Sequence, residues 1–393
     1  MYASSTRQIG CRRLLASPIV GSSGPSVSFN NLIAKTWAEN ILFSVMVELT
    51  YKCNLDCFFC YNDLNLHGQP LTIEQYLAFL EDLRDMQVLN LILTGGEPLA
   101  HPDFFLIGSK AKDLGFVLRI KSNGHALRGR LAQRVKEEID PFVIDMSLHG
   151  ACAETHDRQT RIPGSFDRLM ENIPELQALE LRLKLNCTLT RWNEGEMEEM
   201  FELADRLGIR LGITPTVVPR DDGDTEPLTL TPSRAGKLKL FRLLDARSRV
   251  AGDQQASPAS EGLQPLDDSM MPVSVEKNCG AGSSGITVDP FGNVLPCVQW
   301  RRPVGNLHTQ SIKEIWSGSA GLEEVRSLTV EAKRKVDGYG EKGHLMGFCP
   351  GEAQVTTGDP LSLYPTATEQ MDLLDQVNRE QKSVDRPLLP IVG

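Results

Sequence analysis

The chain has 393 residues, 41% of them hydrophobic and 23% charged, and a net charge of −10. This length allows one large α/β domain and a smaller one. No apolar run is long enough for a membrane span, and no cluster of Lys and Arg marks a nucleic-acid surface, so neither a membrane nor nucleic acid is an expected partner. Nine unevenly spaced cysteines favour metal binding in a reducing compartment, the cytoplasm, over a secreted disulfide framework.

Strand-like and helical patterns alternate over residues 43–220, after an N-terminal segment, 1–42, with one short predicted helix. Thr72 and Gln75 predict a capping box at one helix start, and Gly208 predicts the end of another helix. Alternating strands and helices predict parallel strands in an α/β fold, which suits a partial (β/α)6 TIM-like barrel at least as well as a doubly wound sheet. The six predicted strands are 45–50, 89–96, 116–124, 142–150, 181–190 and 209–217.

One face of these predicted strands is polar. A parallel sheet covered by helices on both sides is expected to be apolar on both faces. The polar face therefore indicates a barrel lumen that holds a polar ligand, with a partly solvated sheet face as the alternative. The residues on this face are Glu48, Thr50, Asp145, Ser147, His149, Asn186, Thr188, Thr190, Thr214 and Thr216.

The rest of the chain divides into three predicted parts. Residues 221–276 are rich in turn formers and form a linker with one docked helix. Residues 277–360 form a small α+β extension, with a hairpin in ITVDPFGNVLPCVQW and a helix that is interrupted at Gly318. Residues 361–393, with Arg-Pro and Leu-Pro pairs, are expected to be a loose C-terminal tail.

Three cysteines, Cys53, Cys57 and Cys60, lie close together directly after the first predicted strand. Structural zinc needs four ligands, and a ferredoxin-type carrier needs four cysteines for each cubane cluster. Three thiolates instead leave one iron of a cubane free for an exogenous ligand. The alternative is three unrelated buried thiols, which this spacing disfavours.

The stretch CNLDCFFCYN after the first strand resembles the signature of the radical S-adenosylmethionine (SAM) superfamily. This resemblance implies that Cys53, Cys57 and Cys60 ligate three irons of a [4Fe–4S] cluster, and that the amino and carboxylate groups of SAM chelate the fourth. It further implies a one-electron reductant such as ferredoxin or flavodoxin. Reductive cleavage of SAM then gives a 5′-deoxyadenosyl radical, which abstracts hydrogen from a substrate.

Further motifs are similar to those of the same family. LTGGEP has glycines that permit close approach of the backbone to a ligand, and the resemblance implies that it binds the amino group of SAM. Arg161, with Arg158 as the rival, is the expected partner of the SAM carboxylate. Cys11, Cys152 and Cys187 are given no role. The full set of expected cofactor-binding residues is Gly95, Gly96, Glu97, Pro98, Ser122, Asn123, Ser147, Arg161 and Asn186.

A second set of cysteines, Cys279, Cys297 and Cys349, resembles the auxiliary-cluster extension called SPASM, or its shorter form, twitch. Full SPASM extensions carry at least seven cysteines and two clusters, whereas this chain has three cysteines after residue 220. One auxiliary [4Fe–4S] cluster is therefore expected. Its fourth position is left between an open iron and the non-cysteine candidates Asp289, His308 and His344. A metal-free hairpin, or a Cys349 that corresponds to a cysteine of the other cluster, are the alternatives.

The two resemblances imply a radical SAM oxidoreductase that modifies a peptide or protein, as in ribosomal peptide maturation by crosslinking, epimerisation or oxidation. The segment before Phe43 is too short for the leader-binding domain of some relatives, so a separate leader-binding protein is an expected partner. A radical SAM enzyme of small-molecule cofactor biosynthesis and a non-catalytic iron–sulfur electron carrier are the alternatives. A carrier would need neither the GGEP motif nor a polar lumen.

Overall fold

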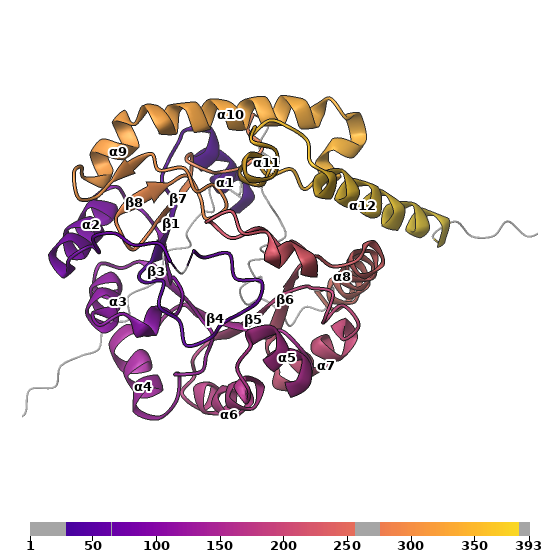
Figure 1. Cartoon of the computed structure of the whole chain (residues 1–393), viewed down its shortest axis with the longest axis horizontal. Coiled ribbons are helices and arrows are strands. Elements are labelled where there is room, and N and C mark those ends of the chain that lie inside the picture. The colour runs from indigo at the N-terminus through magenta and orange to yellow at the C-terminus, as the bar shows by residue number, and fades with distance from the viewer. Residues whose placement is uncertain (1–28, 64, 256–275, 385–393) are drawn as a thin grey trace, which may run out of the picture.

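The computed structural model describes residues 29–63, 65–255 and 276–384 (Figure 1). Its described strands form one nine-stranded sheet in the order β6-β5-β4-β3-β2-β1-β7-β8-β9. The first six strands pair in parallel with their neighbours, and each confirms a predicted strand with slightly shorter ends. They are β1 (Ser44–Glu48), β2 (Asn90–Thr94), β3 (Val117–Ser122), β4 (Val143–Ser147), β5 (Leu183–Thr188) and β6 (Arg210–Thr214).

Helices cover the outer side of these strands, which curve into an open, partial barrel (Figure 1). The predicted capping box is confirmed, because Thr72 and Gln75 bond to each other's backbone at the start of α2. Gly208, with a φ of 66°, ends α7 as predicted. After α1 (Phe29–Ala38), the barrel helices are α2 (Ile73–Asp85), α3 (Phe104–Asp113), α4 (Gly129–Arg134), α5 (Ala153–Thr160), α6 (Ser165–Ala178) and α7 (Met197–Leu207).

The two faces of the curved sheet differ as the alternation predicts. Apolar side chains such as Val45, Leu91 and Ile144 point toward the helices and are fully buried in one large core. On the inner face Glu48 and Asp145 are buried as well, at 0% and 4% exposure. Carboxylates this deeply buried need partners, so around β1 and β4 the inner face is a polar interior rather than a solvated sheet surface. At the β6 end of the same face Thr214 is exposed.

The predicted C-terminal hairpin is confirmed, but it belongs to the same sheet as the barrel. Strands β7 (Gly285–Val288) and β8 (Asn293–Leu295) pair antiparallel, and β9 (Gly305–Asn306) follows. Strand β7 also pairs in parallel with β1, with Ser44 opposite Gly285. The apolar residues of β7 thereby extend the core past β1, so the extension is not a separate layer.

The helix interrupted near Gly318 is also confirmed, as α9 (Ile312–Gly318) and α10 (Ala320–Asp337). Figure 1 shows α10 running from the hairpin side toward α11 (Pro350–Thr357) and α12 (Pro365–Val384). The predicted linker helix is α8 (Arg234–Gln255). None of the helices in the described part of the chain is long and apolar enough to cross a membrane.

The prediction of a loose tail at 361–393 is wrong for most of that segment. Helix α12 packs against α8, and Leu373 and Val377 form a small apolar cluster with Phe241. The burial of these side chains stabilises the helix, as it does for any amphipathic helix on a core. The Arg-Pro and Leu-Pro pairs that suggested a tail lie beyond residue 384, outside the described residues.

Candidate active site

The cysteine loop, residues 53–60, begins just after the carboxyl end of β1. Backbone bonds attach it to the end of α5, where Asp56 N–H donates to Thr160 O and Phe58 N–H donates to Gln159 O. From the end of the barrel segment, the guanidinium of Arg220 donates to the Phe58 carbonyl at 3.3 Å. The loop is thus fixed to three parts of the fold at the edge of the sheet where ligands of parallel α/β folds bind.

The thiols of this loop lie close enough to affect one another. Burial raises the pKa of the Cys57 thiol, and the neighbouring Cys60 and Cys53 raise it further because thiolates repel. A positively charged iron cluster would relieve both effects, so the three residues fit the group that the motif implies. Among the described residues no three His, Cys, Asp or Glu side chains converge on a site for one ion. A cubane, whose thiolates bind different irons, matches this spread better than a single zinc ion does.

The GGEP turn after β2 lies directly under the start of the cysteine loop. Gly96 N–H donates to Thr50 O at 2.6 Å. A Cβ on Gly96 would come within 2.6 Å of the Tyr51 and Lys52 carbonyl oxygens, and Gly95 has a φ of 139°. The glycines therefore permit a close approach between two backbone segments, whereas the predicted approach to a ligand stays a prediction. The backbone that they approach is the segment leading into Cys53.

Glu97 connects this turn to the end of β3. Its carboxylate, 3% exposed, accepts hydrogen bonds from the Ser122 hydroxyl at 3.0 Å and from the Asn123 N–H at 2.9 Å. Burial raises the pKa of Glu97 to about 7, although these donors oppose the rise. Ser122 thus orients Glu97. The side-chain amide of Asn123 donates to Asn54 at 2.7 Å and lies 3.7 Å from Cys53 Sγ.

Two further predicted residues face the lumen on adjacent strands. Ser147 on β4 is the register partner of Asn186 on β5. The Asn186 amide donates to Asp145 at 3.1 Å, and Asp145 also pairs with Arg119 at 3.0 Å. Asn186 therefore points inward as the alternation predicted, and a carboxylate fixes its orientation.

Arg161 lies beside the cysteine loop, at the end of α5. Its guanidinium stacks on the Phe58 ring and lies 3.6 Å from Asp56 and 3.4 Å from Glu226. The rival Arg158 stacks on Trp192 instead. Arg161 thus holds the loop against the linker, and its binding of the SAM carboxylate stays a prediction.

The sequence prediction missed the most connected group in the lumen. Arg301, just after the hairpin, binds Glu48 through two bonds of 2.7 and 2.8 Å and lies 2.9 Å from Asp221. The Tyr51 hydroxyl donates to the same carboxylate at 3.1 Å. Burial raises the pKa of Asp221 to about 7, against the pull of Arg301. The polar-face pattern identified Glu48, but no local signal pointed to its partner.

The second cysteine set also comes together. Burial raises the pKa of Cys279 to about 12, and Cys349 adds to the rise. Burial raises the pKa of Cys297, and the nearby Cys349 and Cys279 raise it further. Cys279 and Cys297 pack beside Trp300, and Cys349 is near enough to act on both thiols. Their convergence fits one auxiliary cluster and argues against a Cys349 that belongs elsewhere.

The candidate fourth ligands are engaged in other contacts. Asp289 accepts the N–H groups of Phe291 and Asn293 and so fixes the hairpin turn. His308 bonds to the Gln75 amide at 3.0 Å and to a backbone carbonyl, and His344 is exposed. The carboxylate whose charge reaches Cys349 is that of Glu352, on α11.

A polar lumen with one cysteine triad at its edge and a second triad on an attached hairpin defines an iron–sulfur enzyme built on a partial barrel. Comparison with protein families agrees: the radical SAM superfamily model matches residues 47–204, and the model for the SPASM iron–sulfur cluster-binding domain matches residues 279–340. The chain therefore contains a radical SAM domain followed by a SPASM domain. Its cofactors are a [4Fe–4S] cluster, SAM and an auxiliary iron–sulfur cluster.

Several characterised proteins are similar over most of the chain. An AdoMet-dependent heme synthase of Methanosarcina barkeri is 27% identical, over 85% of this chain and 97% of that protein. A PqqA peptide cyclase of Ruegeria pomeroyi is 28% identical, over 84% of this chain and 88% of that protein. The mycofactocin maturase MftC of Mycobacterium tuberculosis is 29% identical, over 80% of this chain and 79% of that protein.

Solved structures share the fold. Native anSMEcpe with bound AdoMet superposes with a TM-score of 0.60 at 14% identity, covering 87% of this chain and 100% of that chain. Streptococcus suis SuiB bound to its precursor peptide SuiA gives 0.58 at 14% identity, covering 76% of this chain and 70% of that chain.

Proposed function

We propose that this enzyme abstracts hydrogen from a peptide or protein substrate, in a reaction of ribosomal peptide maturation. The observation that carries the proposal is the extent of the similarity to peptide-modifying relatives. The PqqA peptide cyclase and the mycofactocin maturase align with both the barrel and the SPASM domain, over at least 80% of this chain. The polar lumen, with one cysteine triad at its edge and a second near the attached hairpin, supports radical chemistry over simple electron transfer.

Residues of the cysteine loop and of the neighbouring strand ends form the SAM site in this proposal. Cys53, Cys57 and Cys60 hold the cluster. The Glu97 carboxylate accepts a hydrogen bond from the amino group of SAM. Ser122 and the Asn123 N–H fix the orientation of that carboxylate through bonds of 3.0 and 2.9 Å. Gly95, Gly96 and Pro98 set the turn that carries Glu97. When bound, the cluster and SAM supply the 5′-deoxyadenosyl radical that abstracts hydrogen.

The remaining residues act around this centre. Arg161, beside Asp56, contacts the SAM carboxylate, and Ser147 and Asn186 contact ribose or substrate from the lumen. Cys279, Cys297 and Cys349 hold the auxiliary cluster, which binds substrate through an open iron or relays electrons through a filled one. A separate leader-binding protein and an external one-electron reductant complete the proposed system.

A second candidate is a small-molecule substrate in cofactor biosynthesis. It is favoured by the heme synthase relative, of which the alignment covers 97%. The two candidates differ in the molecule that loses hydrogen, so an isotope label carried by the substrate separates them.

The test uses deuterated material from the native host. Cells are grown in deuterated medium, and their peptides and small proteins are separated from the metabolites. Each fraction is incubated with the reconstituted, reduced enzyme and unlabelled SAM, and the 5′-deoxyadenosine formed is analysed by mass spectrometry. Deuterium from the peptide fraction supports the proposal, whereas deuterium from the metabolite fraction alone supports the second candidate. Cys57→Ala is the control, and it should form no 5′-deoxyadenosine.

A further inference from the structure

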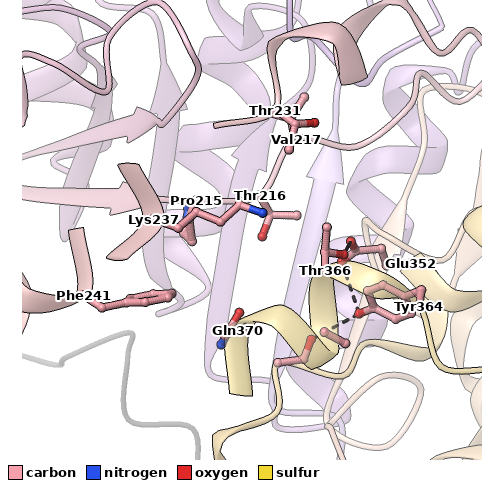
Figure 2. Close-up of a pocket in the computed structure, with 12 residues that line it drawn as sticks. Pro215, Thr216, Val217, Thr231, Lys237, Phe241, Glu352, Tyr364, Thr366 and Gln370 are labelled. Carbon is pink, nitrogen blue, oxygen red and sulfur yellow. Dashed lines mark hydrogen bonds between the residues drawn. The ribbon is translucent and has the colours of Figure 1, made fainter. Parts of the chain in front are cut away.

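A narrow, open cleft lies between the end of β6 and the C-terminal helices (Figure 2). The barrel side contributes residues 215–217, Thr231 and two residues of α8. The other side contributes the start of α12 and residues near Cys349. Its lining is Pro215, Thr216, Val217, Thr231, Lys237, Phe241, Gly347, Glu352, Tyr364, Thr366, Ala367 and Gln370.

The charged groups of the cleft are already neutralised or bonded. Lys237, buried at 7% exposure, pairs with Glu369 at 2.6 Å. The Glu352 carboxylate accepts hydrogen bonds from Thr366 at 2.9 Å and from Tyr364 at 3.3 Å. An anionic ligand would therefore find the Lys237 charge already paired, and the Glu352 oxygens already accept hydrogen bonds from two neutral hydroxyls.

Neutral polar groups remain available in the same cleft. Within the described part of the chain, the side chains of Thr216, Thr231 and Gln370 have no hydrogen-bond partner, although all three are half-buried. The Gln370 amide lies over Gly347, and a Cβ at that glycine would collide with it. The glycine therefore makes room for an amide that faces the cleft.

The main chain beside the cleft is also unpaired. Strand β6 is the last strand of the sheet, and β5 is its partner. Beyond Thr214, the backbone of residues 215–217 makes no hydrogen bond to any other described residue. An unpaired strand edge of this kind accepts an extended peptide as an added strand.

The floor of the cleft is connected to the auxiliary cysteine triad. The Tyr364 hydroxyl accepts a hydrogen bond from the Cys349 N–H at 2.8 Å. Figure 2 shows Tyr364 and Glu352 facing Thr216 and Lys237 across the opening. An occupant of the cleft therefore lies next to the auxiliary cysteines and at the free edge of the barrel.

We infer that this cleft binds an extended segment of the peptide substrate, which pairs with the backbone of residues 215–217 and bonds to Thr216, Thr231 and Gln370. The inference rests on the proposed function and adds the place where the peptide docks. Peptide amides are the ligand that neutral donors and acceptors beside an unpaired strand recognise.

The experiment uses the full-length reconstituted enzyme and the deuterated peptide fraction described above. Thr231→Trp fills the cleft, and Gln370→Leu removes the free amide at nearly the same size. Thr229→Trp is the matched control, because Thr229 lies two residues earlier on the exposed surface and does not line the cleft. Iron content, the unfolding midpoint and 5′-deoxyadenosine formed without peptide report whether each variant keeps an intact radical site.

Deuterium transfer from peptide to 5′-deoxyadenosine is expected to fall on the order of tenfold in both cleft variants, the effect of one or two lost hydrogen bonds. It should stay at the wild-type level in Thr229→Trp. Wild-type levels of deuterium transfer in all three variants would contradict peptide binding in the cleft but would not contradict the proposed peptide function. If the wild-type enzyme takes deuterium from the metabolite fraction alone, both the peptide function and the docking cleft are contradicted.

Discussion

The guanidinium of Arg301 and the carboxylate of Glu48 face each other through two hydrogen bonds of 2.7 and 2.8 Å, although they are 253 residues apart. Glu48 ends the first strand of the barrel, and Arg301 follows the hairpin of the SPASM domain. Asp221, from the linker, lies 2.9 Å from the same guanidinium. One buried arginine therefore connects all three parts of the chain, directly below the cysteine loop.

Arg301→Met should lower the free energy of unfolding by about 3–5 kcal/mol, because it leaves Glu48 as an unpaired charge at 0% exposure. Denaturant unfolding measures this loss. The double variant with Glu48→Gln and Arg301→Met should recover part of it, since the fully buried Glu48 charge is gone while Asp221 still lacks its partner. A double variant as unstable as the single one would contradict this account of the pair.

Iron content tests the two cysteine triads. The reconstituted wild type should hold roughly eight irons, as two cubane clusters do. Replacing Cys53, Cys57 and Cys60 with Ala should leave about half, and replacing Cys279, Cys297 and Cys349 should leave about half as well. A wild type with only four irons, all lost with the first triad, would mean that the SPASM hairpin holds no cluster.

The affinity for SAM should depend on pH through Glu97. Burial raises the pKa of Glu97 to about 7, so the carboxyl is neutral below that pH and is a weaker acceptor for the N–H groups of the SAM amino nitrogen. Affinity should therefore rise as the pH increases toward 7, by up to about tenfold per unit, and level off above it. Equilibrium binding of SAM across this range is the measurement.

Glu97→Gln should remove this pH dependence, because the amide does not titrate. Glu202→Gln, on the exposed face of α7, should keep it. An unchanged slope in Glu97→Gln would assign the titration to another group.

Gly96→Ala should prevent assembly of the first cluster. Its Cβ would lie 2.6 Å from the carbonyl oxygens of Tyr51 and Lys52, which lead into the cysteine loop. The backbone of these two residues cannot shift without moving Cys53. Iron content should therefore fall by about half. Gly195→Ala is the matched control, since its Cβ would meet open space, and equal iron in the two variants would disprove the close approach.

Leu373→Ala tests the docking of α12. Leu373 is fully buried between α12 and α8, so the truncation should cost about 2–5 kcal/mol in denaturant unfolding. Asp372→Ala, the exposed neighbour, should change stability by less than about 0.5 kcal/mol. Equal, small changes in stability at both positions would mean that α12 is not docked on α8 and behaves as the loose tail that the sequence suggested.

Local patterns explain what could be predicted from the sequence. Alternation identified all six barrel strands and the inward position of Glu48, Asp145 and Asn186, because a side chain's face depends only on its place in the strand. The capping box and Gly208 located helix ends for equally local reasons. Helix α12 was missed because two X-Pro pairs further along were given more weight than the helical spacing of Leu373 and Val377.

Long-range relationships could not be predicted in this way. The pairing of β7 with β1 and the choice of Arg301 as the partner of Glu48 depend on tertiary packing, which leaves no periodic signal in the chain. Within the site, the family resemblance named the residues, but it did not indicate that Ser122 would orient Glu97. Nor did it indicate that Arg161 would already contact Asp56.

The place of β1 between β2 and β7 affects how the protein can be made. A ribosome releases β1 early, yet one of its two neighbours begins only at Gly285. Until then the first strand has a free, apolar edge, the kind of surface through which chains aggregate. The sheet therefore cannot finish folding in the order of its synthesis, and the first strand of the barrel is protected only after the hairpin of the SPASM domain has emerged.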